Sequence, residues 1–503
     1  MHLEFAAEPS LLAVLRQVNP WWSGKPVPDL PETPRDILAA VQHGLSQAQP
    51  TLTVLSGLRK VGKSALLAQT AQEIVYGGVA PEQLLYVPFD HPVFRLAGVA
   101  RVVEAWMHVV LGQASSAYLL LDEVQLAEDW PAWLESGRAA LPGRHYIVAA
   151  QSVRPKPAAG AQAEGGGDEA GLIRIAPLTF HEYLGVRGLL EDLRLPEMGS
   201  LRELTGWTPA RFEQAAAQAE RAVALFNEYL LQGGFPDTAS MDDAGSAQRR
   251  LMEDVVERAI RCEAASVYGV RRLGELERLF AYLCMHDAAV LDVQGLAEAL
   301  GISKNTVRSH LDVLEAAHLI QRLPQFGYGA EVLRGRVKVH LAAPALGLGL
   351  LLRGREALED GERTAAAVET AVLNHLTARY PTGGPEFSYW RGKPGEEVSV
   401  VASGGAQSRP FLVRYTQHPG DQAALKGLRR FCRDKSVRLA YVITRNPSDF
   451  GPLTLTAPER GSTDALPTRC LMVPALLFCY WMGRPSLPEP TEQRAGWFKG
   501  LRG

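Results

Sequence analysis

The sequence has few cysteines, and none is spaced for a metal site or a disulfide framework. Five cysteines are scattered over 503 residues, and no two of them form a CxxC pair. This pattern argues against a structural zinc site and against a secreted scaffold held by disulfides. It is typical of a reducing compartment, so we expect a cytoplasmic protein.

Long apolar runs and a strong net charge are also missing. The longest apolar run, ALLFCYWM (475–482), is far shorter than the roughly 20 residues that cross a bilayer. The N-terminal stretch carries two acids and no uninterrupted apolar core, unlike a signal peptide. We therefore expect no membrane contact. A net charge of −3 provides no global field for nucleic acid, so any such contact must come from a local basic patch.

What the chain does contain is enough apolar sequence for several cores. Apolar residues make up 47% of it, and its length allows about three domains. Short apolar segments at 51–56, 84–90, 117–123 and 145–150 alternate with helical stretches. This alternation predicts an α/β fold with a buried parallel sheet and helical crossovers.

A glycine-rich segment, GLRKVGKS (57–64), follows the first expected strand and precedes an expected helix. Gly57 and Gly62 would let backbone N–H groups turn inward around phosphate oxygens. Lys63 would reach the β- and γ-phosphates, and the hydroxyl of Ser64 would ligate Mg²⁺. The motif and its flanking elements predict a P-loop that binds ATP and Mg²⁺.

The strand LLLDE (119–123) ends in two acids, at the edge where an open α/β sheet binds its ligands. Asp122 would hold Mg²⁺ through water, and Glu123 would orient or deprotonate the attacking water. The next strand leads into Gln151 and Ser152, which are candidates for sensing the γ-phosphate. A plain exit from strand to loop explains this last pair equally well.

The chain pattern divides into six regions. We expect an N-terminal lead-in (1–48), a P-loop ATPase core (49–185), a helical lid region (186–285), a winged helix-turn-helix (286–345), a second α/β domain (367–482) and a Pro-rich tail (483–503).

The segment 290–323 has helix-turn-helix form. Gly301 breaks the chain after a short helix, and Ser303 can cap the next one. Lys304, Asn305 and Arg308 would then point outward, where a recognition helix meets a DNA groove. Further candidates, for contact with phosphate, lie in the expected wing: Arg334, Arg336 and Lys338. A lid or a protein-docking module is the alternative use of such a domain.

The chain resembles prokaryotic AAA-type P-loop ATPases that carry a C-terminal domain of unknown function related to PD-(D/E)XK nucleases. The resemblance rests on the P-loop, on LLLDEVQ and on seven further segments: NPWW (19–22), LLYVPFD (84–90), APLTFHEYL (176–184), YLLQGGFP (229–236), a winged-helix segment at 291–323, KVHLAAPAL (338–346) and FSYWRGKPGEEVSVV (387–401). Similar proteins have a Gly-Arg pair before the PLTF-like element, and this chain lacks it. The candidates for a trans-acting arginine are Arg138, Arg144, Arg154 and Arg174.

The resemblance also implies that the nuclease-like domain does not cut. An active member would carry an acid on the second strand and E-x-K on the third, and here those positions hold Ser399, Leu412 and Arg414. Neither Leu nor Ser replaces a carboxylate toward a hard cation. Glu369 would be the one remaining acid. The following basic helix, with Arg429 and Arg430, would bind a phosphate backbone or form a solvated face.

Two classes of function follow. The first is an ATP-hydrolysing protein that acts on DNA, as a homo-oligomeric motor on branched DNA. The second is a nucleotide-gated signalling or defence switch that binds protein partners. An active DNA nuclease is disfavoured by Ser399 and Leu412.

Overall fold

The structure, a computed structural model, describes residues 8–45, 52–112, 114, 116–133, 144–150, 171–266, 268–327, 337–381, 384–404, 407–455 and 468–484. The chain forms two compact units. The first contains the described residues up to Ile175 and a short segment, Ser266–Gly269. The second contains Ala176–Ala265 and Val270–Pro485.

The first unit is built on a five-stranded sheet in the order β2-β3-β4-β1-β5, and every pairing is parallel. Its strands are β1 (Leu52–Ser56), β2 (Leu84–Pro88), β3 (Ala117–Asp122), β4 (Arg144–Ala150) and β5 (Leu172–Arg174). Its helices are α1 (Glu8–Val18), η2 (Pro20–Ser23), α2 (Leu38–Leu45), α3 (Lys63–Tyr76), η3 (Pro81–Gln83), α4 (Pro92–Ala97), α5 (Val99–Trp106), η4 (Met107–Leu111) and η5 (Val124–Leu126). The predicted parallel sheet is confirmed.

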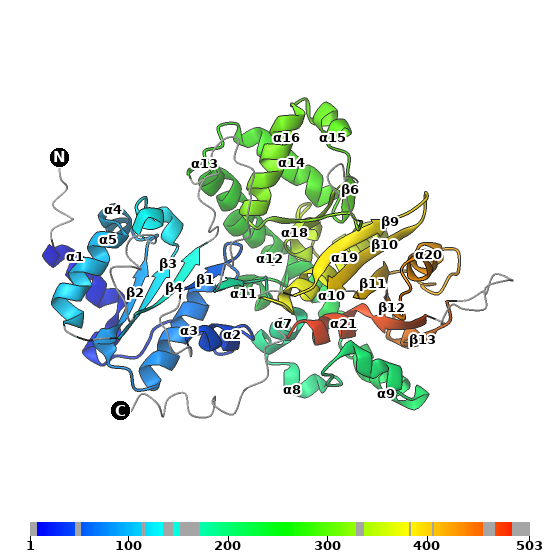
Figure 1. Cartoon of the computed structure of the whole chain (residues 1–503), viewed down its shortest axis with the longest axis horizontal. Coiled ribbons are helices and arrows are strands. Elements are labelled where there is room, and N and C mark those ends of the chain that lie inside the picture. The colour runs from blue at the N-terminus through cyan, green and yellow to red at the C-terminus, as the bar shows by residue number, and fades with distance from the viewer. Residues whose placement is uncertain are drawn as a thin grey trace. The chain divides into compact units, whose positions relative to one another are not determined.

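Both faces of this sheet are covered, which explains why its strands are apolar throughout. All residues of β3 are buried. Leu119 and Leu121 face a core that includes α1, α4 and α5, and α3 lies on the other face (Figure 1). The carboxyl ends of β1 and β3 therefore meet at one edge, where the P-loop and the two acids stand.

The lead-in segment NPWW protects the outer edge of β2. The side chain of Asn19 donates to the carbonyl of Tyr86 and accepts from its N–H, at 2.9 and 2.7 Å. The indole N–H groups of Trp21 and Trp22 both donate to the carbonyl of Leu84, at 3.1 and 2.9 Å. Because an uncovered strand edge invites pairing with other chains, these side chains replace a sixth strand.

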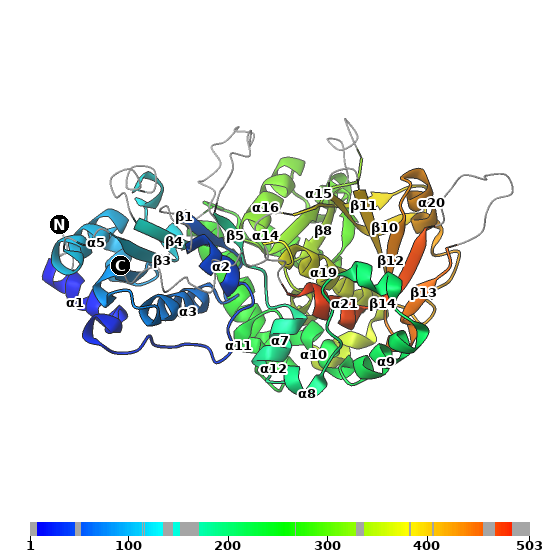
Figure 2. The ribbon, with the colours of Figure 1, turned by 60° about the horizontal axis from the view of Figure 1, so that its bottom comes forward.

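The second unit begins with helices: α7 (Phe180–Val186), α8 (Leu190–Leu193), η6 (Leu201–Gly206), α9 (Pro209–Glu220), α10 (Val223–Gln232), α11 (Pro236–Ala239), α12 (Ala244–Leu251), η7 (Met252–Glu263), α13 (Ala264–Ser266, whose last residue is counted with the first unit) and α14 (Leu273–Met285). Figure 2 shows α7, α10 and α12 gathered together. The segment PLTFHEYL opens this unit. Its Thr179 accepts from the N–H of Glu182, whose side chain accepts in turn from the N–H of Thr179, so α7 starts with a reciprocal cap.

The winged helix-turn-helix lies within the second unit. It consists of α14, β6 (Ala289–Leu291), α15 (Val293–Leu300), α16 (Lys304–Ala316), β7 (Ile320–Leu323) and β8 (Val337–Leu341), and its antiparallel sheet has the order β6-β8-β7. Gly301 ends α15 in the left-handed region at φ 67°, and Ser303 caps α16 by accepting from the N–H of Thr306.

The C-terminal part contains a six-stranded mixed sheet in the order β13-β14-β12-β11-β10-β9. Its elements are α18 (Pro344–Gly349), η8 (Gly354–Glu359), α19 (Gly361–Ala378), β9 (Glu386–Arg391), β10 (Glu397–Gly404), β11 (Gln407–Arg414), α20 (Lys426–Asp434), β12 (Leu439–Thr444), η9 (Pro447–Asp449), β13 (Gly451–Leu453), β14 (Arg469–Pro474) and α21 (Ala475–Met482). One face of the sheet packs on α19 and α21 and the other on α20. The apolar segment 475–482 is thus a buried core helix, and none of the described helices could span a membrane.

Candidate functional site

The P-loop follows β1 and turns sharply before α3. Lys60 and Gly62 both have positive φ, at 64° and 94°, and glycine accepts this conformation without strain. Gly57 is needed for a different reason. A Cβ atom there would lie 2.4 Å from the carbonyl oxygen of Ile175, beyond the end of β5. The loop is therefore shaped by close backbone approaches as well as by its own turn.

Lys63 is the first residue of α3 and is only 4% exposed. Its ammonium donates to the carbonyl oxygens of Gly57 and Leu58, both at 3.1 Å, and lies 3.8 Å from a carboxylate oxygen of Glu123. The cation is thus held inside the turn at a helix N-terminus. This is the arrangement that binds phosphate groups.

Asp122 ends β3 and is 3% exposed. Burial, together with the neighbouring charge of Glu123, raises the pKa of Asp122 to about 6, although a hydrogen bond from Ser64 opposes the shift. The structure thus brings together the two predicted Mg²⁺ ligands, a hydroxyl and a carboxylate. Their hard oxygen atoms fit a magnesium ion held mainly through water and phosphate.

Tyr86 is a part of the site that sequence reasoning missed. Its hydroxyl donates to Oδ2 of Asp122 at 3.1 Å, while its backbone is held by Asn19. The lead-in therefore connects to the predicted magnesium ligand through one residue of β2. The only sequence signal was the unexplained NPWW segment.

Glu123 stands in an unusual backbone conformation, with φ 48° and ψ 38°. A residue other than glycine in this left-handed region is uncommon, and such residues cluster at functional sites. One carboxylate oxygen accepts from the side-chain amide of Gln125 at 2.5 Å, and the other faces Lys63. The predicted catalytic acid thus lies at the P-loop edge next to Asp122.

Arg35 is a second missed residue. It is 8% exposed, and its guanidinium donates to the carbonyl of Val61 within the P-loop. The side chain of Gln69 on α3 links to the same segment, because it accepts from the N–H of Arg35 at 3.4 Å and donates to the carbonyl of Thr33 at 3.3 Å. The lead-in therefore supports the phosphate-binding loop directly.

Several predicted residues lie outside the described ranges: Gln151, Ser152, Arg138, Arg154, Arg334 and Arg336. Arg144 begins β4, at the end of the strand away from the P-loop edge. Arg174 ends β5, is exposed, and pairs in register with Ser56 just before the P-loop. Of the described arginine-finger candidates, Arg174 is therefore the one at the edge of the nucleotide site.

The exposed face of α16 carries Lys304, Asn305 and Arg308. The acidic side chains that could neutralise this face contact other residues of the chain instead. Asp312 and Glu315 both pair with Arg322 on β7, with Asp312 at 2.8 Å. Glu298 accepts from Gln294 on its own helix. The acid-rich sequence around α16 therefore leaves two cations available at its N-terminal end.

The basic helix α20 behaves differently. Arg430 pairs with Glu396 at 2.6 Å and with Asp434 at 3.5 Å, and Lys426 also reaches Glu396, at 3.4 Å. Arg429 donates to the carbonyl of Gln422 at 2.7 Å. These cations are largely occupied within the chain, so α20 carries less free positive charge than its sequence indicates.

The elements α19, β9, β10, β11, α20 and β12 follow in the order that was predicted for the C-terminal domain. The assignment of Leu412 and Arg414 to the catalytic positions is corrected by the structure. Leu412 belongs to the core on the α20 face, whereas Phe411 belongs to the core on the α19 face. Side chains alternate along a strand, so Phe411 and Val413 are the residues of β11 that share a face with Glu369. Both are apolar, and the absence of an E-x-K motif remains.

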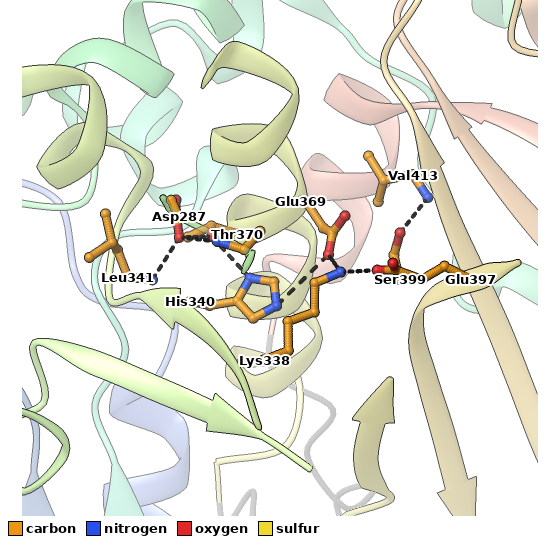
Figure 3. A network of polar contacts seen from close by, with 10 residues as sticks. Asp287, Lys338, His340, Leu341, Glu369, Thr370, Glu397, Ser399 and Val413 are labelled. Atoms are coloured by element: carbon orange, nitrogen blue, oxygen red, sulfur yellow. Dashed lines mark hydrogen bonds and ion pairs between the residues drawn. The ribbon is translucent and has the colours of Figure 1, made fainter. Parts of the chain in front are cut away.

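The prediction that Lys338 contacts phosphate is wrong, because this lysine is buried and pairs with acids of the C-terminal part of the chain. Lys338 of β8 is 3% exposed, and its ammonium lies 2.5 Å from a carboxylate oxygen of Glu369 and 2.5 Å from one of Glu397 (Figure 3). Burial alone would lower the pKa of Lys338, but the two carboxylates outweigh it and raise that pKa. Glu369 is therefore not the only acid of this cluster, because the ammonium of Lys338 lies between it and Glu397.

Other polar side chains extend this cluster (Figure 3). Ser399 accepts from the N–H of Val413 at 3.1 Å. His340 contacts the hydroxyl of Thr370 at 3.0 Å, and both burial and the charge of Lys338 lower the pKa of His340. Within the described ranges no three His, Cys, Asp or Glu side chains are grouped to hold a metal.

Comparisons with known protein families agree with this reading of the first unit. Residues 49–184 match the family described as an AAA domain. Residues 49–184 therefore form an AAA-type domain that carries the P-loop. Its residues 223–356 and 364–452 match two domains of unknown function, DUF8612 and DUF4143. The predicted C-terminal domain of unknown function is therefore present in this AAA-type protein.

Individual relatives are distant. An uncharacterised protein of Haemophilus influenzae is 21% identical over 281 residues, which cover 55% of this chain and 62% of that protein. A Walker-type ATPase of Pyrococcus abyssi is 14% identical, with a TM-score of 0.36 over 66% of this chain and 99% of the other. The ORC1 protein of Aeropyrum pernix, solved with DNA, is 15% identical, with a TM-score of 0.24 over 62% and 90%. Likenesses this weak do not bear on what the AAA-type protein binds.

Proposed function

We propose that this AAA-type protein binds ATP with Mg²⁺ and hydrolyses it. The proposal rests on one observation, the convergence of Lys63, Asp122 and Glu123 at the carboxyl edge of a parallel sheet. Lys63 faces the phosphates, Ser64 and Asp122 would hold the metal ion, and Glu123 takes a proton from the attacking water. Mg²⁺ would offset the negative charge of the phosphates.

Two substitutions test this proposal. Lys63→Ala removes the buried cation and should abolish ATP binding. Glu123→Gln keeps the shape but not the base, so it should bind ATP and turn it over at least about 100-fold more slowly. Lys25→Ala and Glu128→Gln are matched controls, because both side chains are exposed. Turnover by Glu123→Gln at the wild-type rate would show that another group acts as the base.

We infer further that the protein acts on DNA through α16. The support is the exposed pair Lys304 and Arg308, one helical turn apart, whose neighbouring acids are bound by Arg322 and Gln294. A recognition helix uses such residues at its N-terminal end for phosphates and base edges. Assembly into a homo-oligomer, with Arg174 a candidate for the trans-acting arginine, stays a prediction.

The DNA test compares two double variants by fluorescence anisotropy over a series of salt concentrations. Lys304→Ala with Arg308→Ala should weaken binding more than about tenfold and lower the salt slope by roughly two. Arg429→Ala with Arg430→Ala should have a smaller effect, because both guanidiniums have partners inside the chain. Wild-type protein without any salt-sensitive DNA binding would instead favour a nucleotide-gated switch that binds protein.

A further inference from the structure

We propose that Gln125 binds the attacking water together with Glu123. The inference deepens the proposed ATP hydrolysis and rests on it. Gln125 lies in η5, which begins directly after Glu123, the residue in the left-handed conformation. It would act as a second acceptor that fixes the orientation of the water, a role that the DE motif alone does not assign.

The orientation of the Gln125 side chain is set by its partner. Its amide nitrogen donates to Oε2 of Glu123 at 2.5 Å. A carboxylate only accepts hydrogen bonds, so the nitrogen is the amide atom that faces Glu123, and the carbonyl oxygen takes no part in this contact. That oxygen, Oε1, is buried and has no hydrogen-bond partner among the described residues.

An unpaired buried carbonyl is costly, and native structures usually satisfy it with protein or water. Gln125 lies in the short helix η5, whose backbone is held in place. Two backbone hydrogen bonds close the turn: the N–H of Leu126 donates to the carbonyl of Glu123, and the N–H of Ala127 donates to the carbonyl of Val124, both at 3.0 Å. Val124 is 1% exposed and anchors the turn. The backbone of the turn is therefore fixed, and the hydrogen bond to Glu123 holds the Gln125 amide beside that carboxylate.

A water molecule has two O–H groups, and this pair of side chains offers one acceptor for each. One O–H would donate to Glu123 and the other to Oε1 of Gln125. Both protons are then held, and a lone pair of the water oxygen is left for the γ-phosphorus. As the new P–O bond forms, Glu123 takes one proton, the bond from phosphorus to the β–γ bridging oxygen breaks, and ADP leaves with that electron pair.

The test uses Gln125→Leu, which has similar volume but no amide, in the full-length protein. We expect kcat to fall roughly 10- to 100-fold, as for the loss of one group that orients the reacting atoms. KM for ATP and the Kd of a fluorescent ATP analogue should stay within about twofold, because no phosphate contact is removed. Gln125→Met provides a second apolar replacement if the first folds poorly.

Gln83→Leu is the matched control. This glutamine ends η3, just before β2, and donates to the carbonyl of Ser116 at 3.0 Å, at the opposite end of the sheet from the P-loop. It should hydrolyse ATP like the wild type. Adding Gln125→Leu to Glu123→Gln should cost little beyond Glu123→Gln alone, since residues that act as a unit are not additive.

The outcomes separate the two proposals. If wild-type protein does not hydrolyse ATP, or Glu123→Gln hydrolyses it normally, the proposed function is wrong. If both of those tests succeed and Gln125→Leu keeps the wild-type kcat, only the role of Gln125 is wrong. A Gln125→Leu variant that hydrolyses ATP faster than wild type would also overturn the proposed role of Gln125, because the amide would then restrain Glu123 instead of orienting the water.

Discussion

Replacing Lys338 by methionine should destabilise the second unit strongly. The side chain is 3% exposed and pairs with Glu369 and Glu397, whose side chains are 15% and 34% exposed. Removing one partner of a buried ion pair typically costs about 3–5 kcal/mol, because the remaining charge stays buried and unpaired. Glu397 is partly solvated, which screens its share. We therefore expect a loss of about 3 kcal/mol.

The assay is urea unfolding at pH 7, followed by circular dichroism and by tryptophan fluorescence, with the transition of the second unit analysed separately from that of the first. The triple variant Lys338→Met, Glu369→Gln, Glu397→Gln removes all three charges and should recover more than half of the loss. Arg355→Met is the control, since its guanidinium is 70% exposed and pairs with Glu228 on the surface. A loss below about 0.5 kcal/mol for Lys338→Met, or no recovery in the triple variant, would refute the reasoning.

Three further predictions follow from other parts of the chain. Gly57→Ala should weaken ATP binding at least about tenfold in an equilibrium titration and destabilise the first unit by about 1–3 kcal/mol, because its Cβ would meet the Ile175 carbonyl at 2.4 Å. His375 accepts from the N–H of Phe180 at 2.8 Å, and burial lowers its pKa from 6.5 to about 4. Its contribution to stability is therefore complete above pH 6.5 and falls by about 2–3 kcal/mol as the pH drops toward 4, and urea unfolding of His375→Gln should show a flatter pH dependence in this window. Purified protein should not cleave plasmid, duplex or branched DNA with Mg²⁺ or Mn²⁺, because the pocket holds an ammonium and the α19 face of β11 is apolar; cleavage abolished by Glu369→Ala would contradict this.

The sequence predicts a site well where the functional residues lie close together along the chain. The P-loop, the DE pair and the helix-turn-helix are local patterns, and each imposes its own strand, turn or helix. Gly301 and Ser303 end one helix and start the next as predicted. Lys304 and Arg308 could be placed on the exposed face of α16 because helical periodicity fixes which residues share a face.

Sequence reasoning failed where strand register or distant packing decides the outcome. In β11, Phe411 pairs with Val400 and packs on the α19 face, so the next residue, Leu412, packs on the α20 face. A shift of one residue reverses which face each side chain occupies, so the catalytic positions of a strand could not be read from its letters.

By itself, then, the sequence predicted the parallel α/β sheet, the P-loop and the helix that carries Lys304 and Arg308, because each is marked by a local pattern of residues, even though the strands themselves pair over long distances. The tertiary structure alone decided that Asn19 holds Tyr86 against Asp122 and that Lys338 pairs with Glu369 and Glu397. These contacts join residues tens of positions apart along the chain. Such long-range contacts follow from how strands pair and helices pack, which no local periodicity encodes.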